Sequence, residues 1–159
     1  MNSIMQNYWP IFELYQAMRG QMLGVLTDAD LLFFPGGANP PLGELFREIG
    51  ETERAYIDSF KQFTCDFSYR NLEPAMAESV ARLGAWFTEL DHELKAAIEG
   101  LTDEQIQNQR VTRGPNFRPP IQIQLSVYQE ALLIFYGKAS VYLKALEKPM
   151  PEQVRDWIA

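Results

Sequence analysis

The feature that most constrains the fold is a series of apolar residues that recurs every three or four positions. Met76, Val80, Leu83, Phe87, Leu90, Leu94 and Ala97 follow one another at steps of 4, 3, 4, 3, 4 and 3. Because an α-helix has about 3.6 residues per turn, these side chains form one narrow stripe. Such a stripe is typical of a helix in a left-handed bundle. We predict a helix over about residues 74–99, ended by Gly100 in the left-handed conformation that glycine tolerates.

Three further segments show helical periodicity and predict helices over about residues 5–26, 41–63 and 119–146. In segment 5–26 the apolar stripe lacks a member between Tyr15 and Met22, and Met18 or Arg19 occupies that position. The last segment is apolar on two neighbouring stripes, of which the second contains Ile123, Val127, Ala131, Ile134, Val141 and Ala145. A surface that broad needs cover on two sides, so this helix is either central in the bundle or also part of a homodimer contact. Gly137 is a poor helix former and predicts a close approach by a neighbouring backbone.

Two pairs of similar segments indicate internal symmetry. "LTDADL" (26–31) and "LTDEQI" (101–106) each follow a long helical pattern, and Thr27 and Thr102 suit helix N-caps. "NPPLGEL" (39–45) and "RPPIQIQL" (118–125) each precede the next long pattern. We interpret the chain as two helix–loop–helix halves joined by a short link over 64–73. The predicted fold is all-α: a single domain, residues 1–159, forming an antiparallel four-helix bundle with two longer crossover loops.

Composition restricts the class of protein. The chain of 159 residues is 47% hydrophobic, as in globular proteins, and its formal net charge of −7 disfavours nucleic-acid binding. No apolar run approaches the roughly 18 residues of a membrane helix, and the N-terminal residues do not resemble a signal peptide. Cys65 is the only cysteine, so no internal disulfide can form. We therefore expect a cytoplasmic protein with no membrane or nucleic-acid partner.

Two segments resemble the DinB/YfiT-like superfamily: "LGELFREIGETERAYI" (42–57), and "FYGKASVYLKAL" (135–146) followed by "EKPMP". The order of elements and the two "LTD" segments also fit, so the resemblance covers nearly the whole chain. It implies a four-helix bundle that is often dimeric. It also implies a divalent metal held by three histidines in many members, one on the second helix and two, four residues apart, on the fourth.

The positions that match these histidines are Glu48, Ala131 and Phe135, so the sequence departs from the pattern at all three. Two of these side chains cannot ligate a metal, and we expect no metal and no cofactor. The only histidine, His92, lies two residues past Leu90, about 200° around the helix from the apolar stripe. We expect His92 to face solvent.

Five residues remain as candidates for ligand binding: Glu48, Glu53, Tyr128, Phe135 and Tyr136. Glu53 lies near the buried stripe of its helix, and Glu48 lies at the edge of that stripe. Burying a carboxylate is costly unless it is paired or protonated. Each is therefore either a solvated or hydrogen-bonded structural group, or an acid that faces a ligand. A tyrosine such as Tyr128 or Tyr136, or an arginine of the 107–118 loop, could pair with it.

The sequence leaves the activity open. HExxH, phosphate-loop and CxxC motifs are missing, and a catalytic Cys65 would need a base, and Cys65 lies in a loop of a chain with only one histidine. We favour a metal-free bundle that binds a small molecule or forms a homodimer. The alternatives are an enzyme of the metal-dependent hydrolase or thiol-dependent transferase type found among relatives, or a protein-interaction subunit. Fold alone does not distinguish them.

Overall fold

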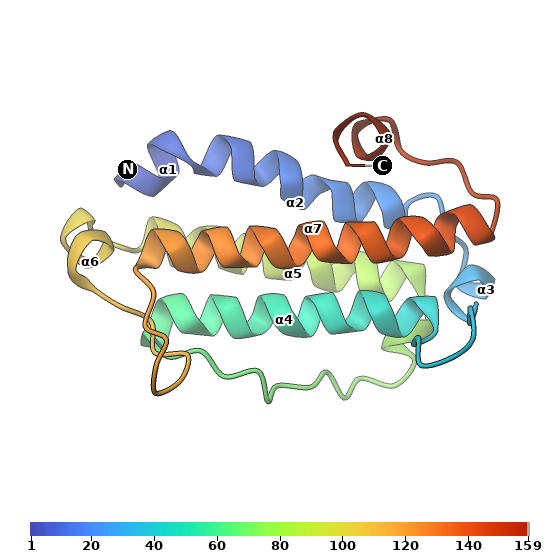
Figure 1. Ribbon diagram of the computed structural model, residues 1–159, viewed down its shortest axis with the longest axis horizontal. Coiled ribbons are helices and arrows are strands. Elements are labelled where there is room, and N and C mark those ends of the chain that lie inside the picture. Colours follow the sequence, from blue (N-terminus) through green and yellow to red (C-terminus); the bar gives the residue numbers. More distant parts are fainter. Residues whose placement is uncertain (159) are drawn as a thin grey trace.

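The computed structural model describes residues 1–158, and helices cover about two-thirds of the chain (Figure 1). The four long helices are α2 (Trp9–Leu23), α4 (Leu42–Gln62), α5 (Val80–Glu99) and α7 (Ile121–Ala145). The short ones are α1 (Ser3–Asn7), α3 (Asp28–Leu31), the 3-10 helix η1 (Met76–Glu78), α6 (Asp103–Asn108) and α8 (Glu152–Trp157). Among these described residues there is no strand, only isolated bridges. The predicted all-α bundle is confirmed.

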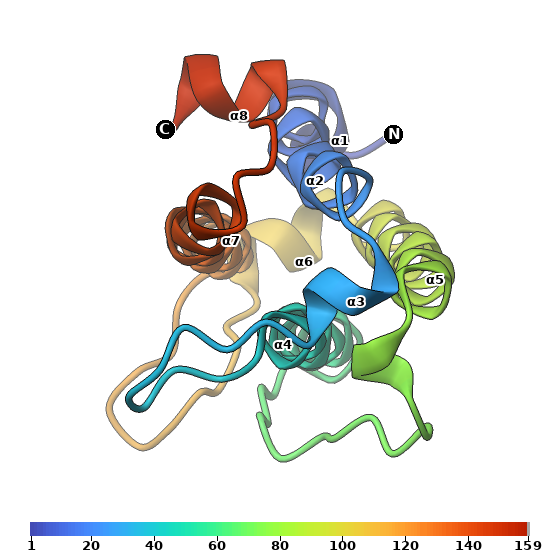
Figure 2. The ribbon, with the colours of Figure 1, turned by 90° about the vertical axis from the view of Figure 1, so that its right-hand side faces the viewer.

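The long helices form a ring in which α2 and α4 occupy opposite corners (Figure 2). α4 packs against α5 and α7, and α2 packs against the same two helices from the other side. Along the chain, α2 and α7 run in one direction and α4 and α5 in the other (Figure 1). The neighbours α4 and α7 are therefore antiparallel, whereas the neighbours α4 and α5 are parallel.

This topology corrects the expected short link over 64–73. Because α4 and α5 are parallel neighbours, the chain must return along the whole bundle between them, and Figure 1 shows this segment running beside α4. A 21-residue helix is about 30 Å long, a distance that an extended segment of about ten residues can span. The connections that contain α3 and α6 stay at opposite ends of the bundle (Figure 1).

The helix boundaries follow from local chemistry. Thr27 and Thr102 are N-caps with complete capping boxes, as the repeated segments predicted. Gly100 has φ −71°, so the left-handed cap expected there is wrong: its N–H continues the helical bonding to the Ala96 carbonyl. The left-handed cap lies instead at Phe63, where α4 ends with φ 57°.

Two predicted helices are interrupted near their starts. The first breaks at Tyr8, and α2 begins anew with Pro10 in its first turn, where proline removes no helical hydrogen bond. The third begins at Val80 rather than residue 74, because the Ser79 side chain accepts a hydrogen bond from the Arg82 N–H and caps α5.

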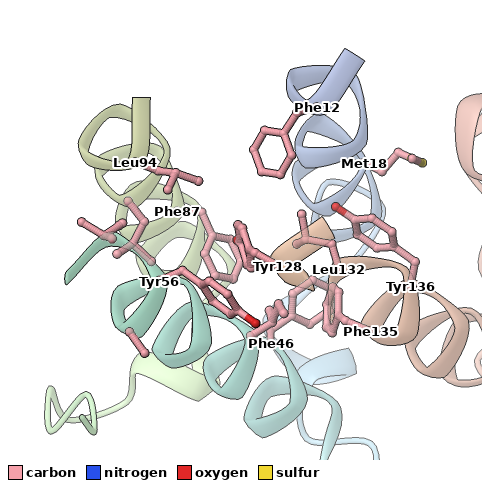
Figure 3. Packing of buried hydrophobic residues seen from close by; sticks show 14 of the residues in the cluster. Phe12, Met18, Phe46, Tyr56, Phe87, Leu94, Tyr128, Leu132, Phe135 and Tyr136 are labelled. Carbon is pink, nitrogen blue, oxygen red and sulfur yellow. The ribbon is translucent and has the colours of Figure 1, made fainter. Parts of the chain in front are cut away.

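The core lies on the ring axis. Leu83, Phe87, Leu90 and Leu94 of the predicted stripe are all buried. Figure 3 shows Phe46, Tyr56, Phe87, Tyr128 and Phe135 converging from three helices. The C-terminal α8 packs on α2, where the Trp157 and Tyr15 rings meet edge to face. In residues 1–158, every helix is too short or too polar to cross a membrane.

Candidate functional site

The structure divides the five candidate residues into two groups. Glu48 and Phe135 line a surface pocket between α4 and α7. Glu53, Tyr128 and Tyr136 lie inside the bundle, where none of them is accessible to solvent. The two groups belong to different environments and have to be considered separately.

The α4/α7 pocket has a volume of about 210 Å³ and is lined by Leu45, Glu48, Ile49, Thr52, Ala131, Ile134, Phe135 and Lys138. On α4 the lining residues form the pairs Leu45/Ile49 and Glu48/Thr52, and on α7 the pairs Ala131/Phe135 and Ile134/Lys138. The two members of each pair lie on the same face of their helix because they are four positions apart. The apolar floor comes from Leu45 and Ile49 of α4 and Phe135 of α7. Phe135 is fixed by an edge-to-face contact with Phe46, at 5.0 Å between ring centroids.

Charge is confined to the rim of this pocket. Glu48 projects from α4 and Lys138 from α7, and both side chains are exposed. Neither takes part in an ion pair with any residue between 1 and 158. The pocket therefore offers an apolar floor, one carboxylate and one ammonium, each with free bonding capacity toward a bound molecule.

A divalent metal does not fit this pocket. Glu48, Ala131 and Phe135 all line it, so the three positions that match histidines in the resemblance do lie together. A methyl group and a phenyl ring have no lone pair to donate, which leaves a single carboxylate. Elsewhere in the described chain, no group of three His, Cys, Asp or Glu side chains could hold a metal ion. His92 is exposed on α5, as its helical position predicts.

The interior group is organised by Arg19 of α2, which is 1% exposed. Its guanidinium is paired with the fully buried Glu53 of α4 and donates to Asp91 Oδ1 of α5 at 2.6 Å. Gln16 adds a hydrogen bond to Glu53 Oε1 at 2.8 Å, and Arg19 stacks over the Phe87 ring at 4.0 Å. Three helices are thus joined by one network of charged side chains in the middle of the core.

Tyr128 is bonded to this network, and Tyr136 lies beside it, bonded to the backbone of α2. Arg19 donates to the Tyr128 hydroxyl at 3.5 Å, and the Tyr136 hydroxyl donates to the Tyr15 carbonyl at 2.6 Å. Burial raises the pKa of both phenols well above the ordinary value. Both are therefore protonated in the ordinary pH range and act as hydrogen-bonding core residues. Figure 3 shows both among the apolar side chains.

Asp91 is the part of the network that reaches solvent. It lines a cavity of about 280 Å³ between α2 and α5, together with Gln16 and His92. Burial raises its pKa to about 7, an effect that Arg19 opposes and the nearby Glu53 carboxylate reinforces. Two carboxylates share one guanidinium here, and Asp91 is the more exposed of the two, with its side chain 37% accessible.

This shift predicts a pH-dependent stability. The folded pKa of Asp91 lies above the unfolded value of about 3.9, so the folded state binds more protons between these values. The contribution of Asp91 to stability is therefore full below about pH 4 and is lost as the pH rises to about 7. Asp91→Asn removes this titration. We therefore expect the free energy of unfolding of Asp91→Asn, relative to that of the original protein, to increase from pH 5 to pH 8 in urea unfolding.

Glu89→Gln, on the exposed side of the same helix, is the matched control and should show no such trend. A difference between Asp91→Asn and the original protein that stays constant from pH 5 to pH 8 would contradict the assignment of the titration to Asp91.

Sequence reasoning placed Glu53 near the buried stripe but missed its partner. We expected a tyrosine or an arginine of the 107–118 loop. The loop residue Arg113 instead donates to the Tyr56 hydroxyl at 3.0 Å, and the partner of Glu53 is Arg19. The available signal was the spacing of Phe12, Gln16 and Arg19, which puts two polar side chains on the inward face of α2.

Comparison with known proteins supports the fold. No family model matches the sequence, and no curated protein matches it. Among solved structures, the crystal structure of a DinB-like protein, YjoA of Bacillus subtilis, is similar with a TM-score of 0.70 and 14% sequence identity. The match covers 89% of this chain and 94% of the other. The chain therefore has the fold of a DinB-like protein, as the resemblance predicted.

Proposed function

We propose that this protein binds a small molecule with an apolar body and a charged head in the α4/α7 pocket, without a metal ion. The observation that carries the proposal is the combination of an apolar floor with a carboxylate and an ammonium at the rim, neither of which has an ion-pair partner in residues 1–158. Ligand sites combine mostly apolar walls with a few polar groups in this way.

The size of the pocket limits the ligand. At about 210 Å³ it is smaller than the roughly 300–1,000 Å³ of typical ligand sites. It can accept a body the size of a single aromatic ring or a short branched chain. Ile49 and Phe135 would contact that body, Lys138 would pair with an anionic head and Glu48 with a cationic head.

Phenylacetate and phenethylamine test this proposal because they share the apolar body and differ in the charge of the head. We expect saturable binding of both by ligand-observed NMR, in the millimolar range. Ala131→Phe should abolish both by filling the pocket, whereas Ala85→Phe on the exposed face of α5 should abolish neither. Lys138→Met should weaken phenylacetate alone, and Glu48→Gln phenethylamine alone. Binding that survives Ala131→Phe, or no saturable binding of either probe, would overturn the proposal.

The proposal includes an expectation about zinc. Purified, untagged protein should carry no stoichiometric transition metal by elemental analysis, and added zinc should not raise its melting temperature. Phe135→His alone should not change this, because Ala131 still leaves the four-apart pair incomplete. The triple variant Glu48→His, Ala131→His, Phe135→His places three imidazoles around one pocket and should be stabilised by zinc. About one bound metal per chain in the original protein, lost on Glu48→Ala, would contradict the metal-free proposal.

A hydrolase or transferase working through Glu48 remains the second candidate function. The observation that favours it is the exposed carboxylate over an apolar floor, where a bound molecule could be held against a base. Turnover of a probe that is lost in Glu48→Gln while binding of that probe persists would establish it.

A further inference from the structure

The Arg19 network carries more negative than positive charge. Glu53 and Asp91 are two carboxylates, and Arg19 is the only cation among residues 1–158 that forms an ion pair with either of them. One negative charge is therefore left uncompensated beside groups that are almost fully buried. A charge that is partly removed from water without a counter-charge is costly, so a second cation that reached the network would stabilise it.

The space between α2 and α5 is the place where a cation can reach this charge. The two helices are neighbours in the ring (Figure 2), and the cavity between them, here called the α2/α5 cavity, has a volume of about 280 Å³. Asp91 lies in its wall, with the side chain 37% exposed and only Oδ1 bonded to Arg19. Glu53 is fully buried and does not line the cavity. Asp91 is thus the carboxylate of the network that a guest molecule can contact.

Two further hydrogen-bond acceptors lie in the wall of the α2/α5 cavity. Gln16 is 4% exposed, and its Nε2 atom donates to Glu53, which leaves the amide oxygen Oε1 for another donor. No residue between 1 and 158 donates to that oxygen. Thr88 donates its hydroxyl proton to the Gly84 carbonyl at 2.9 Å, so the lone pairs of its Oγ1 atom stay free. With the Asp91 carboxylate, the cavity offers three groups that can accept hydrogen bonds.

The other charged groups of the cavity do not supply the missing cation. Lys95 lies one turn beyond Asp91 on α5, but its Nζ atom is 3.5 Å from Glu13 Oε1 of α2. Both members of that pair are exposed, so the pair lies at the rim and is weakened by water. His92 is exposed and forms no ion pair with another residue of 1–158. A guest cation would therefore not have to displace a cation of the protein from Asp91.

We propose that the α2/α5 cavity binds a small primary ammonium, with its ammonium group on Asp91 and a short alkyl chain against Trp9. An ammonium has one positive charge, which equals the excess negative charge of the network, and three N–H donors for the three acceptors. A divalent metal ion fits less well, because it takes about six to eight oxygen ligands. This cavity lies between a different pair of helices from the α4/α7 pocket, and the proposal does not depend on the function proposed there.

The ammonium should compete with a proton for Asp91. Burial raises the pKa of Asp91 to about 7. An alkylammonium stays charged well above that pH, as the lysine side chain does with a pKa of about 10.4. Because only the ionised carboxylate attracts a cation, the affinity should fall as the pH drops below 7. A pKa of about 7 predicts binding about 30-fold weaker at pH 5.5 than at pH 8.

The charged and titratable groups around Asp91 come from four helices. Arg19 of α2 keeps its charge and stays paired with Glu53 of α4. Tyr128 and Tyr136 of α7 stay neutral, because burial raises the pKa of both phenols. On α5 the neighbour His92 is of the residue type that commonly titrates near neutral pH, so it needs a control of its own.

The indole of Trp9 provides a signal from the cavity itself. Its Nε1–H donates to Glu13 Oε1 at 3.4 Å, so a cation bound beside this pair should shift its NMR signal. Ethylammonium chloride is the probe, added in sodium phosphate at pH 8 and constant ionic strength. We expect a saturable shift of the Trp9 signal in the millimolar range and no such shift of the Trp157 signal on α8. Absence of a saturable Trp9 shift, or an equal shift from added sodium chloride, would overturn the proposal.

Two variants remove the site in different ways. Asp91→Asn removes the charge, and Ala17→Phe fills the cavity from its exposed rim while leaving every charge in place. Each should abolish the shift. Glu89→Gln, on the exposed side of α5, should retain it, and so should Ala131→Phe, which fills the α4/α7 pocket instead. Survival of the shift in Asp91→Asn or Ala17→Phe would overturn the proposal, and so would its loss in Ala131→Phe.

The same signal measures the competition with the proton. The dissociation constant of ethylammonium should be about 30-fold higher at pH 5.5 than at pH 8, as the pKa of Asp91 requires. His92→Gln should show the same dependence as the original protein. An affinity that does not change with pH, or a pH dependence that disappears in His92→Gln, would exclude Asp91 as the group that holds the ammonium.

A tethered ammonium tests the site without any added molecule. Thr88 lies three residues before Asp91 on α5, so Thr88→Lys can place its own ammonium beside that carboxylate. This variant should no longer bind ethylammonium. Its free energy of unfolding relative to the original protein should increase from pH 5 to pH 8, because the added charge lowers the pKa of Asp91. Ala81→Lys, exposed and about 15 Å from Asp91 along the helix, should show neither effect. Equal behaviour of the two lysine variants would contradict the proposed site.

Discussion

Replacing Arg19 by methionine is expected to lower the free energy of unfolding by about 3–5 kcal/mol, the usual cost of removing one partner from a buried ion pair. Arg19 and Glu53 are 1% and 0% exposed. Methionine fills much of the space of the arginine stem, so the loss of volume is small and the loss of charge dominates. Glu53 would then keep its hydrogen bond from Gln16, and no other cation in residues 1–158 forms an ion pair with it.

The free energy of unfolding that Arg19→Met loses should depend on pH. Arg19 lowers the pKa of Asp91, which burial nevertheless raises to about 7. Without Arg19 that pKa should rise further, so the folded variant binds more protons than the unfolded chain over a wider pH range. Stability of Arg19→Met should therefore fall as the pH rises. Its deficit against the original protein should be smaller at pH 5 than at pH 8. Urea unfolding monitored by circular dichroism at both pH values measures this.

Two controls separate charge from packing. The double variant Arg19→Met with Glu53→Gln removes both fully buried charges and should recover at least half of the lost stability, because the carboxylate then left without Arg19 is Asp91, whose side chain is 37% exposed. Arg82→Met breaks the exposed pair with Glu73, where both side chains are about half exposed, and should cost no more than about 1 kcal/mol. A deficit for Arg19→Met below that of Arg82→Met would contradict the structural role of the network.

The fold could be predicted from the sequence because each long helix carries its own apolar stripe. Leu83, Phe87, Leu90 and Leu94 are buried as their spacing requires. The breaks at Tyr8 and before Val80 were missed, because the features beside them, Pro10 in the first turn of α2 and the Ser79 cap of α5, are local and leave the stripe unchanged. The long return between α4 and α5 was missed because a stripe shows which side of a helix is buried and does not show its direction in the bundle.

The site was predicted less completely, for a related reason. Sequence spacing placed Glu53 near the core and Glu48 at its edge, which the structure reproduces. The partner of Glu53 lies on a helix at the opposite corner of the ring, 34 positions away in sequence. No local pattern connects two such helices.

Gly43→Ala should be the second strongly destabilising substitution, with a loss near the upper end of the 1–3 kcal/mol that overpacking usually costs. A Cβ at Gly43 would lie 1.7 Å from the carbonyl oxygen of Ala77, where η1 packs on the first turn of α4. That oxygen belongs to the backbone and cannot move aside by rotating a side chain. Either η1 or the start of α4 would have to shift, and Leu42 and Met76 beside them are buried.

Two other glycines provide the scale for this effect. At Gly50 a Cβ would lie 2.4 Å from the Trp86 ring, which can tilt, so Gly50→Ala should cost less than Gly43→Ala. At Gly20, exposed in α2, a Cβ would meet nothing within 4 Å, and alanine should stabilise the helix by about 0.5–1 kcal/mol. Urea unfolding of the three variants should therefore rank Gly20→Ala above the original protein, Gly50→Ala below it and Gly43→Ala lowest. Equal stability of Gly43→Ala and Gly20→Ala would contradict the close contact between α4 and η1 at Gly43.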